Sequence, residues 1–126
     1  ILVYSVLQML ANSEEVIFFV KRAADLLTPG GVLLLGDLPN TDEKERFLKT
    51  REGQEFFQKW KAELDQAPVL DTGLDRDDKT VEINDSLIET LVKVAHNRGL
   101  EVQLLQQPSN LPFGNTRQDL WLSRPL

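Results

Sequence analysis

The chain of 126 residues has the size of one domain or part of one, and its 41% apolar and 27% charged residues are typical of a globular protein. Its formal net charge of −6 argues against an electrostatic grip on nucleic-acid phosphates, which takes clustered lysine and arginine. The absence of cysteine excludes disulfides, thiolate metal sites and a cysteine nucleophile, and favours a reducing compartment, with the cytoplasm as the default. The apolar runs are far shorter than the roughly 20 residues of a membrane span, so we expect neither a nucleic-acid nor a membrane partner.

The chain opens on an apolar run over residues 1–6. Such a run predicts a strand buried on both faces, as in a parallel sheet covered by helices. It has no methionine, cap or polar lead-in, so we expect an N-terminally truncated chain. Asn12 and Glu15 then have capping-box spacing, and apolar residues recur at helical intervals up to Thr28. These signals predict a helix over residues 13–27.

Pro29, Gly30 and Gly31 form a predicted tight turn, which leads directly into a buried strand over residues 32–35. Strand, helix and strand make a βαβ unit, whose crossover should be right-handed. Because the turn precedes a strand and does not open a helix, we assign it a structural role and not that of a phosphate loop.

Residues 41–66 mix aromatic and charged side chains at mostly helical spacing. We expect one or two amphipathic helices, with a break near Gly53. Phe56, Phe57 and Trp60 fit two uses, packing on the rest of the domain or a lid over an acceptor, and packing is favoured. Residues 67–79 are rich in aspartate without the pattern of a calcium loop, so we expect a solvated connection.

The last third of the chain predicts one helix and two strands. Ser86 and Glu89 form a second capping-box pattern, and Gly99 is the expected C′ residue of the helix. Residues 100–106 alternate as a half-exposed edge strand does. After a loop, residues 119–122 form the last strand, in which Leu120, Trp121 and Leu122 are apolar on both faces, as an interior strand requires. His96, near the helix end, is expected to have a surface role.

This order of elements resembles the C-terminal half of a class I S-adenosylmethionine-dependent methyltransferase. Residues 4–8, Tyr-Ser-Val-Leu-Gln, resemble the segment after that fold's fourth strand. Residues 26–31, Leu-Leu-Thr-Pro-Gly-Gly, resemble the turn before its fifth strand, and Gly36 with Asp37 matches the end of that strand. Two departures are that Gln8 stands where histidine is common, and that the family's glycine-rich cofactor loop is absent.

The resemblance implies an α/β fold with a Rossmann-like mixed sheet, whose antiparallel last strand lies between its two neighbours. Residues 1–126 would form the C-terminal part of a single methyltransferase domain, with a helical insertion at about 41–79. Tyr4, Ser5, Val6 and Gln8 would border the methionine and methyl end of S-adenosylmethionine. The alternative for Ser5 and Gln8 is that they only end a strand and start a loop.

Asp37 follows a buried strand at the sheet edge where sites form, and it is the candidate catalytic residue. It could equally cap the turn that ends at Asn40, itself a candidate substrate-binding residue. If the strand at 100–106 runs parallel to the first two, the loop after it overhangs the site and brings Phe113, Asn115 and Arg117 to the acceptor. The alternative is a simple hairpin in which Phe113 fills the core.

The sequence thus predicts an enzyme that moves a methyl group from S-adenosylmethionine to a small molecule, by positioning or with Asp37 as a base. We expect residues 1–126 alone to bind the cofactor weakly. The alternatives are a non-catalytic interaction module with this fold and, less favoured, a nicotinamide-binding Rossmann domain, for which an all-parallel sheet would be expected. Homo-oligomerisation is left open.

Overall fold

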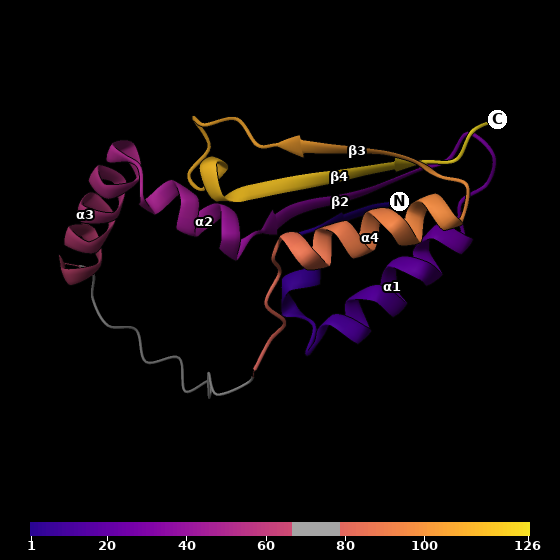
Figure 1. Ribbon diagram of the computed structural model, residues 1–126, viewed down its shortest axis with the longest axis horizontal. Coiled ribbons are helices and arrows are strands. Elements are labelled where there is room, and N and C mark those ends of the chain that lie inside the picture. The colour runs from indigo at the N-terminus through magenta and orange to yellow at the C-terminus, as the bar shows by residue number, and fades with distance from the viewer. Residues whose placement is uncertain (67–78) are drawn as a thin grey trace.

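The computed structural model describes residues 1–66 and 79–126, so most of the predicted aspartate-rich connection lies outside the described residues. Its centre is an open mixed sheet with the strand order β1-β2-β4-β3 (Figure 1). The strands are β1 (Leu2–Tyr4), β2 (Val32–Pro39), β4 (Arg117–Ser123) and β3 (Glu101–Gln106). β1 is parallel to β2, whereas β4 is antiparallel to both of its neighbours. The predicted insertion of an antiparallel last strand between two others is therefore confirmed, as is the edge position of β3.

Two helices, α1 (Ser13–Asp25) and α4 (Asp85–Asn97), lie side by side over one face of this sheet (Figure 1). The core forms where their apolar stripes meet the inward side chains of β2 and β4. Its fully buried members include Val16, Val20, Leu33, Leu35, Leu91, Leu120 and Leu122. Burial of these side chains is the main driving force for this part of the fold.

Asparagines cap both helices. The side chain of Asn12 accepts a hydrogen bond from the backbone N–H of Glu15 at 2.9 Å, which confirms the first predicted cap. At α4 the cap is Asn84, whose side chain accepts from Leu87 N–H at 2.9 Å, so the predicted cap at Ser86 is wrong. The reason is that Asn84 has the extended backbone of a cap residue, whereas Ser86 already lies inside the helix.

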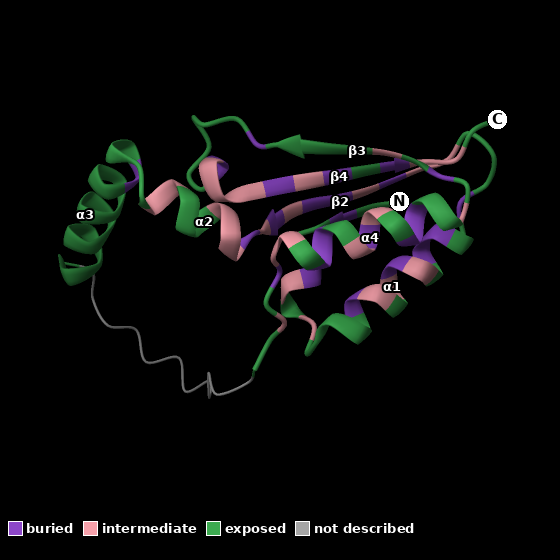
Figure 2. Cartoon of the chain, in the orientation of Figure 1, coloured by how far each residue is buried: buried purple, intermediate pink, exposed green. Residues whose placement is uncertain are grey.

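The other face of the sheet is open among the described residues (Figure 2). Leu2, Tyr4 and Trp121 are 69%, 51% and 39% exposed. Leu2 pairs with Leu34, which pairs with Trp121, so they form an apolar row across three strands. The prediction that the first strand is buried on both faces is therefore wrong, since α1 and α4 cover one face only.

The region after β2 forms two helices, α2 (Thr41–Leu48) and α3 (Arg51–Gln66), beyond the end of the sheet (Figure 1). The break falls at residues 49–50 and not at Gly53. The Thr50 hydroxyl accepts a hydrogen bond from Gly53 N–H at 3.0 Å and so caps α3. Gly53 lies where α3 meets the end of α2, and a Cβ there would overlap the Phe47 carbonyl oxygen. It serves close packing and does not end a helix.

Short 3₁₀ helices, η1 (Leu7–Met9) and η2 (Gly114–Thr116), follow β1 and precede β4. Within the described ranges, no helix has both the length and the apolar character needed to cross a bilayer.

Candidate functional site

Two strained residues lie near the carboxyl ends of the parallel strands, one directly after β1 and one inside β2, two residues before its end. Ser5 (φ 56°) and Asp37 (φ 58°) are the only non-glycine residues with positive φ in the described part of the chain. The Ser5 backbone N–H donates to the Gly36 carbonyl at 3.1 Å, and its hydroxyl donates to the Asp37 carboxylate. Such backbone strain costs about 1–3 kcal/mol per residue and clusters at functional sites.

A β-bulge turns Asp37 away from the core. Leu35 pairs with Leu120 and Leu38 pairs with Gln118, so Gly36 and Asp37 together face only Asp119. Inward side chains therefore pass from Leu35 directly to Leu38, both fully buried. In place of a ladder bond, the Asp37 N–H donates to the Asp119 carboxylate at 2.8 Å. The Asp37 side chain is left at the rim of the sheet.

Polar groups from β2 and β4 and from the residues directly after β1 and β3 meet at this rim. Asp37 accepts hydrogen bonds from Arg117 Nη1 and from Gln107 Nε2, both at 3.3 Å, besides the one from Ser5. Gln107, which is buried, also donates to Asp119 at 3.1 Å. We call Ser5, Asp37, Gln107, Asp119 and Arg117 the strand-end cluster. It combines two carboxylates with one cation at the edge of the sheet where the parallel strands end.

The predicted acceptor loop does reach this cluster. Because β3 is antiparallel to β4 and β4 to β2, β3 runs parallel to β2 and ends at the same sheet edge. Arg117 contacts Asp37 directly, and its guanidinium carbon lies 5.3 Å from the centre of the Phe113 ring, within cation–π range. Phe113 is 47% exposed, so it does not fill the core. Asn115 lies in η2 between them.

The four predicted cofactor-binding residues surround the end of β1. The Tyr4 ring lies against Gly36, where a Cβ would come within 2.5 Å of it. Val6 is 41% exposed. Gln8, in η1, has a buried Oε1 that finds no hydrogen-bond partner among the described residues. The segment therefore offers apolar surface and the Ser5 hydroxyl, whereas the Gln8 oxygen lies beneath the surface.

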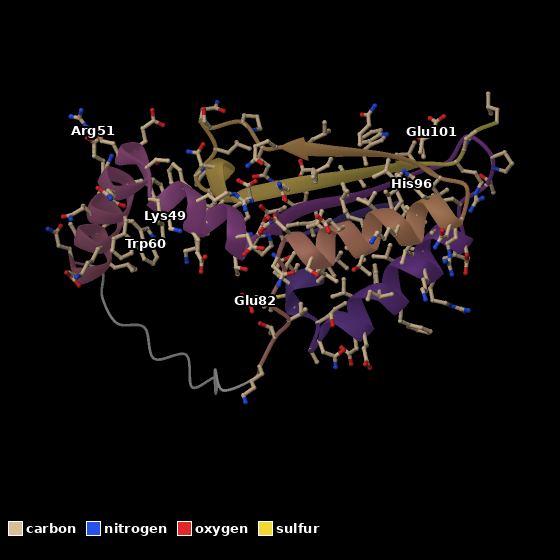
Figure 3. All side chains as sticks on the ribbon, viewed as in Figure 1. Lys49, Arg51, Trp60, Glu82, His96 and Glu101 are labelled. Carbon is tan, nitrogen blue, oxygen red and sulfur yellow. The ribbon has the colours of Figure 1, made fainter. Side chains whose placement is uncertain are left out.

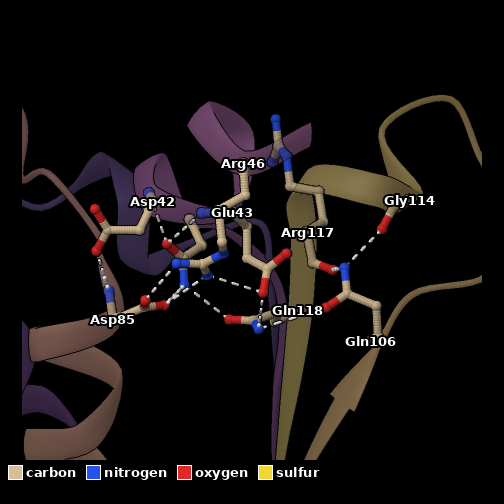
Figure 4. Close-up of polar contacts among 9 residues, drawn as sticks. Asp42, Glu43, Arg46, Asp85, Gln106, Gly114, Arg117 and Gln118 are labelled. Carbon is tan, nitrogen blue, oxygen red and sulfur yellow. Dashed lines mark hydrogen bonds and ion pairs between the residues drawn. The ribbon is translucent and has the colours of Figure 1, made fainter. Parts of the chain in front are cut away.

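Asn40 is buried and holds three elements together; Figure 4 labels its hydrogen-bond partners Asp42, Glu43, Asp85 and Gln118. Its Oδ1 caps α2 by accepting from Asp42 N–H at 2.9 Å and from Glu43 N–H at 3.2 Å. Its Nδ2 donates to Asp85 Oδ1 at 2.9 Å, on α4, and to Gln118 Oε1 at 3.0 Å, on β4. All its polar side-chain atoms are thus used inside the protein, and these contacts favour a structural role over the predicted substrate binding.

An ion-pair network lies beside Asn40 on the surface. Arg46 contacts Asp85 at 2.8 Å and Glu43 at 3.1 Å. The pKa of Asp85 lies below its ordinary value, chiefly because Arg46 and then Asn40 donate hydrogen bonds to its carboxylate. The network ties α2 to α4 and thereby fixes the start of α2 relative to the sheet.

A pocket of about 260 Å³ opens between α2, α3 and the β3–β4 connection. It is lined by Pro39, Asn40, Thr41, Lys44, Phe47, Leu48, Phe56, Phe57, Trp60, Phe113, Thr116 and Arg117. We call it the aromatic pocket. Figure 3 shows Trp60 on the side of α3 that faces α2. Arg117 belongs to both the pocket and the strand-end cluster, so the two adjoin.

Sequence reasoning missed two members of the cluster. Asp119 was assigned only to the last strand, although a carboxylate in an interior strand is an unusual residue that could have been noticed. Gln107 gave no signal, because nothing distinguishes it from the adjacent Gln106. His96 is exposed in the last turn of α4 (Figure 3), in agreement with the predicted surface position. No group of three or more His, Asp or Glu in the described ranges is placed to hold a metal ion.

No protein-family model matches the chain, and no curated protein matches it in sequence. The function is therefore inferred from the fold and from the geometry of the strand-end cluster and the aromatic pocket.

Proposed function

We propose that the protein carrying this chain is an S-adenosylmethionine-dependent methyltransferase that acts on a small-molecule acceptor. The observation that supports this proposal most is the insertion of antiparallel β4 between the parallel strands β2 and β3. An all-parallel sheet would instead have favoured a nicotinamide-binding Rossmann domain. In both folds, ligands bind at the carboxyl ends of the parallel strands, where the strand-end cluster lies.

The residues around the end of β1 fit one edge of the cofactor. Tyr4 and Val6 would contact its apolar parts, and the Ser5 hydroxyl could accept a hydrogen bond from its ammonium group. When bound, the cofactor supplies an electrophilic methyl group on a sulfonium. The sequence holds no glycine-rich cofactor loop, so residues 1–126 alone should bind the cofactor weakly.

The strand-end cluster is suited to positioning a methyl acceptor. The Asp37 carboxylate is held by Ser5, Gln107 and Arg117, so its oxygens are fixed in place and its charge is balanced by a guanidinium. A carboxylate held in this way can orient an acceptor hydroxyl or amine toward the methyl group. We therefore assign Asp37 an orienting role, with alignment as the main source of rate.

The first test is calorimetric titration of the protein carrying this chain with S-adenosylhomocysteine, for which we expect saturable binding. In the same protein, Asp37→Asn should lower kcat/KM by about tenfold to a hundredfold, since a small misplacement of reacting groups has such an effect. Its Tm should fall by less than about 4 °C, because asparagine also tolerates positive φ and only the charge of one partly exposed ion pair is lost.

The matched control is Asp25→Asn, which removes an aspartate paired with Arg98 at 3.0 Å on α1, away from the cluster. It should leave kcat/KM unchanged. Equal effects of the two substitutions on turnover, or a loss of Tm without a loss of turnover in Asp37→Asn, would make Asp37 a structural turn residue.

The second candidate is a non-catalytic interaction module, which the exposed apolar row of Leu2, Leu34 and Trp121 favours, because such surfaces often bind other proteins. Absence of S-adenosylhomocysteine binding would support this candidate over the methyltransferase.

A further inference from the structure

The aromatic pocket has one wall made by the crossing of α2 and α3. Gly53 allows α3 to approach the end of α2 closely, and this brings Phe47 and Phe56 into edge-to-face contact with ring centres 5.9 Å apart. Trp60 stands one turn further along α3. Phe56 and Trp60 remain 38% and 40% exposed although they line a pocket. Their open ring surfaces are available to a ligand.

The opposite wall brings charge into the pocket. Phe113 faces it from the β3–β4 connection, next to Arg117. The Arg117 charge is balanced by Asp37. Lys44, on α2, also lines the pocket and forms no ion pair within residues 1–66 and 79–126. The pocket therefore carries one uncompensated positive charge, in a protein whose overall charge is −6.

The volume of the pocket limits the size of the ligand it can bind. A cavity of about 150 Å³ holds one benzene ring, so about 260 Å³ accommodates a body of one or two fused rings. We infer that the aromatic pocket binds a small acceptor with a flat apolar body and one anionic group, the body held by Phe56 and Trp60 and the anion by Lys44. That this ligand is the methyl acceptor rests on the proposed function. That the pocket binds such a ligand does not depend on the proposed function.

The test is calorimetric titration with two probes of nearly equal shape, 2-naphthoate and its neutral analogue 2-naphthylmethanol. Naphthoate should bind about two- to fivefold more tightly, within the range that one exposed ion pair contributes. Lys44→Gln should abolish that difference and leave the affinity for naphthylmethanol unchanged. Lys49→Gln, which removes the same charge at the end of α2 outside the pocket lining, should preserve the difference.

The aromatic wall is tested by Phe56→Ala, which should weaken both probes by about tenfold or more through lost ring contact and apolar burial. Phe18→Ala, on an α1 residue that is 64% exposed, is its control and should change neither affinity. Lys44→Gln keeps the inference falsifiable if Phe56→Ala disturbs α3, because it changes an exposed side chain on α2 and not a residue of α3.

Failure of both probes to bind, equal affinity for the two, or equal effects of Lys44→Gln and Lys49→Gln would overturn the inference. These outcomes are distinct from failure of the proposed function. Naphthoate binding without S-adenosylhomocysteine binding would support the inferred pocket and reject the methyltransferase. S-adenosylhomocysteine binding without naphthoate binding would support the methyltransferase and reject the inferred pocket.

Discussion

The sheet with α1 and α4 differs from the α2–α3 region in what holds it together. Side chains such as Val16 and Leu120 are completely buried between sheet and helices, whereas the only buried residue of α3 is Gly53. The sheet region can thus supply the global stability, and the α2–α3 region can present half-exposed aromatic rings because the fold does not depend on burying them. Regions of low local stability are where ligand-binding elements are commonly found. The stability of the fold and the proposed ligand recognition would thus lie in two parts of one chain.

The largest effect is expected for a substitution in the sheet region. Leu120→Ala removes a fully buried side chain from the interior strand and should lower the free energy of unfolding by about 2–5 kcal/mol, through lost transfer energy and a residual cavity. Leu64→Ala, at a site on α3 that is 51% exposed, should change it by less than about 0.5 kcal/mol. Urea denaturation measures both. Similar losses for the two leucines would show that α3 belongs to the same cooperative core.

A smaller effect is expected at the junction of the two regions. Asn40→Ala removes the cap of α2 together with the hydrogen bonds to Asp85 and Gln118. It should lower the free energy of unfolding by about 2–3 kcal/mol, more than a cap alone provides. Asn12→Ala, which removes only the cap of α1, should lower it by about 1 kcal/mol. If the two variants were equally stable, Asn40 would act as a cap and nothing more.

The smallest expected effect is a loss of folding stability at acidic pH. Since Arg46 holds the pKa of Asp85 below its ordinary value, ionised Asp85 stabilises the fold above the unfolded pKa of about 3.9. That stabilisation is lost as the pH falls below this value and through the folded pKa. It should be small, because both side chains are about half exposed and solvent screens them.

Nuclear magnetic resonance titration of the Asp85 carboxyl carbon should show the lowered pKa, and Arg46→Gln should raise that pKa toward the ordinary value. Arg51→Gln, which breaks an exposed pair with Glu55 within α3, is the control and should leave the Asp85 titration unchanged. An unchanged Asp85 pKa in Arg46→Gln would mean that the ion pair does not persist in solution.

Local signals predicted most of the fold. The Asn12 cap, the turn at Gly30 and the existence of the edge strand β3 are read from a few neighbouring residues, and each has a direct physical meaning. The alternation along β3 is only partly reflected in burial, because Val102 is half-buried but Leu104 is 47% exposed. The choice between Asn84 and Ser86 as the cap of α4 failed, because both residue types cap helices and only the backbone conformation separates them. The prediction of a helix break near Gly53 failed for a related reason. A glycine can end a helix or allow close packing, and the sequence does not distinguish the two uses.

The candidate site was predictable only where topology determines it. The end of β2 and the loop before β4 were expected at one sheet edge, and Asp37 does meet Arg117 there. Gln107 and Asp119 were not expected, because their role depends on the bulge in β2. The bulge is a property of strand pairing and leaves no periodic signal in the sequence.

That bulge makes the number of residues in β2 as important as their identity. Upstream of it, odd-numbered positions such as Leu35 point into the core, and downstream the even-numbered Leu38 does so. The positions that point into the core thus change from odd to even numbers once along the strand, at Gly36 and Asp37. Loss of a single residue there would restore regular pairing and shift Asp37 out of its bulge position, even if every chemical group of the strand-end cluster were retained. Related proteins could therefore keep Ser, Asp and Arg at these places and still lack the site, if their β2 were one residue shorter.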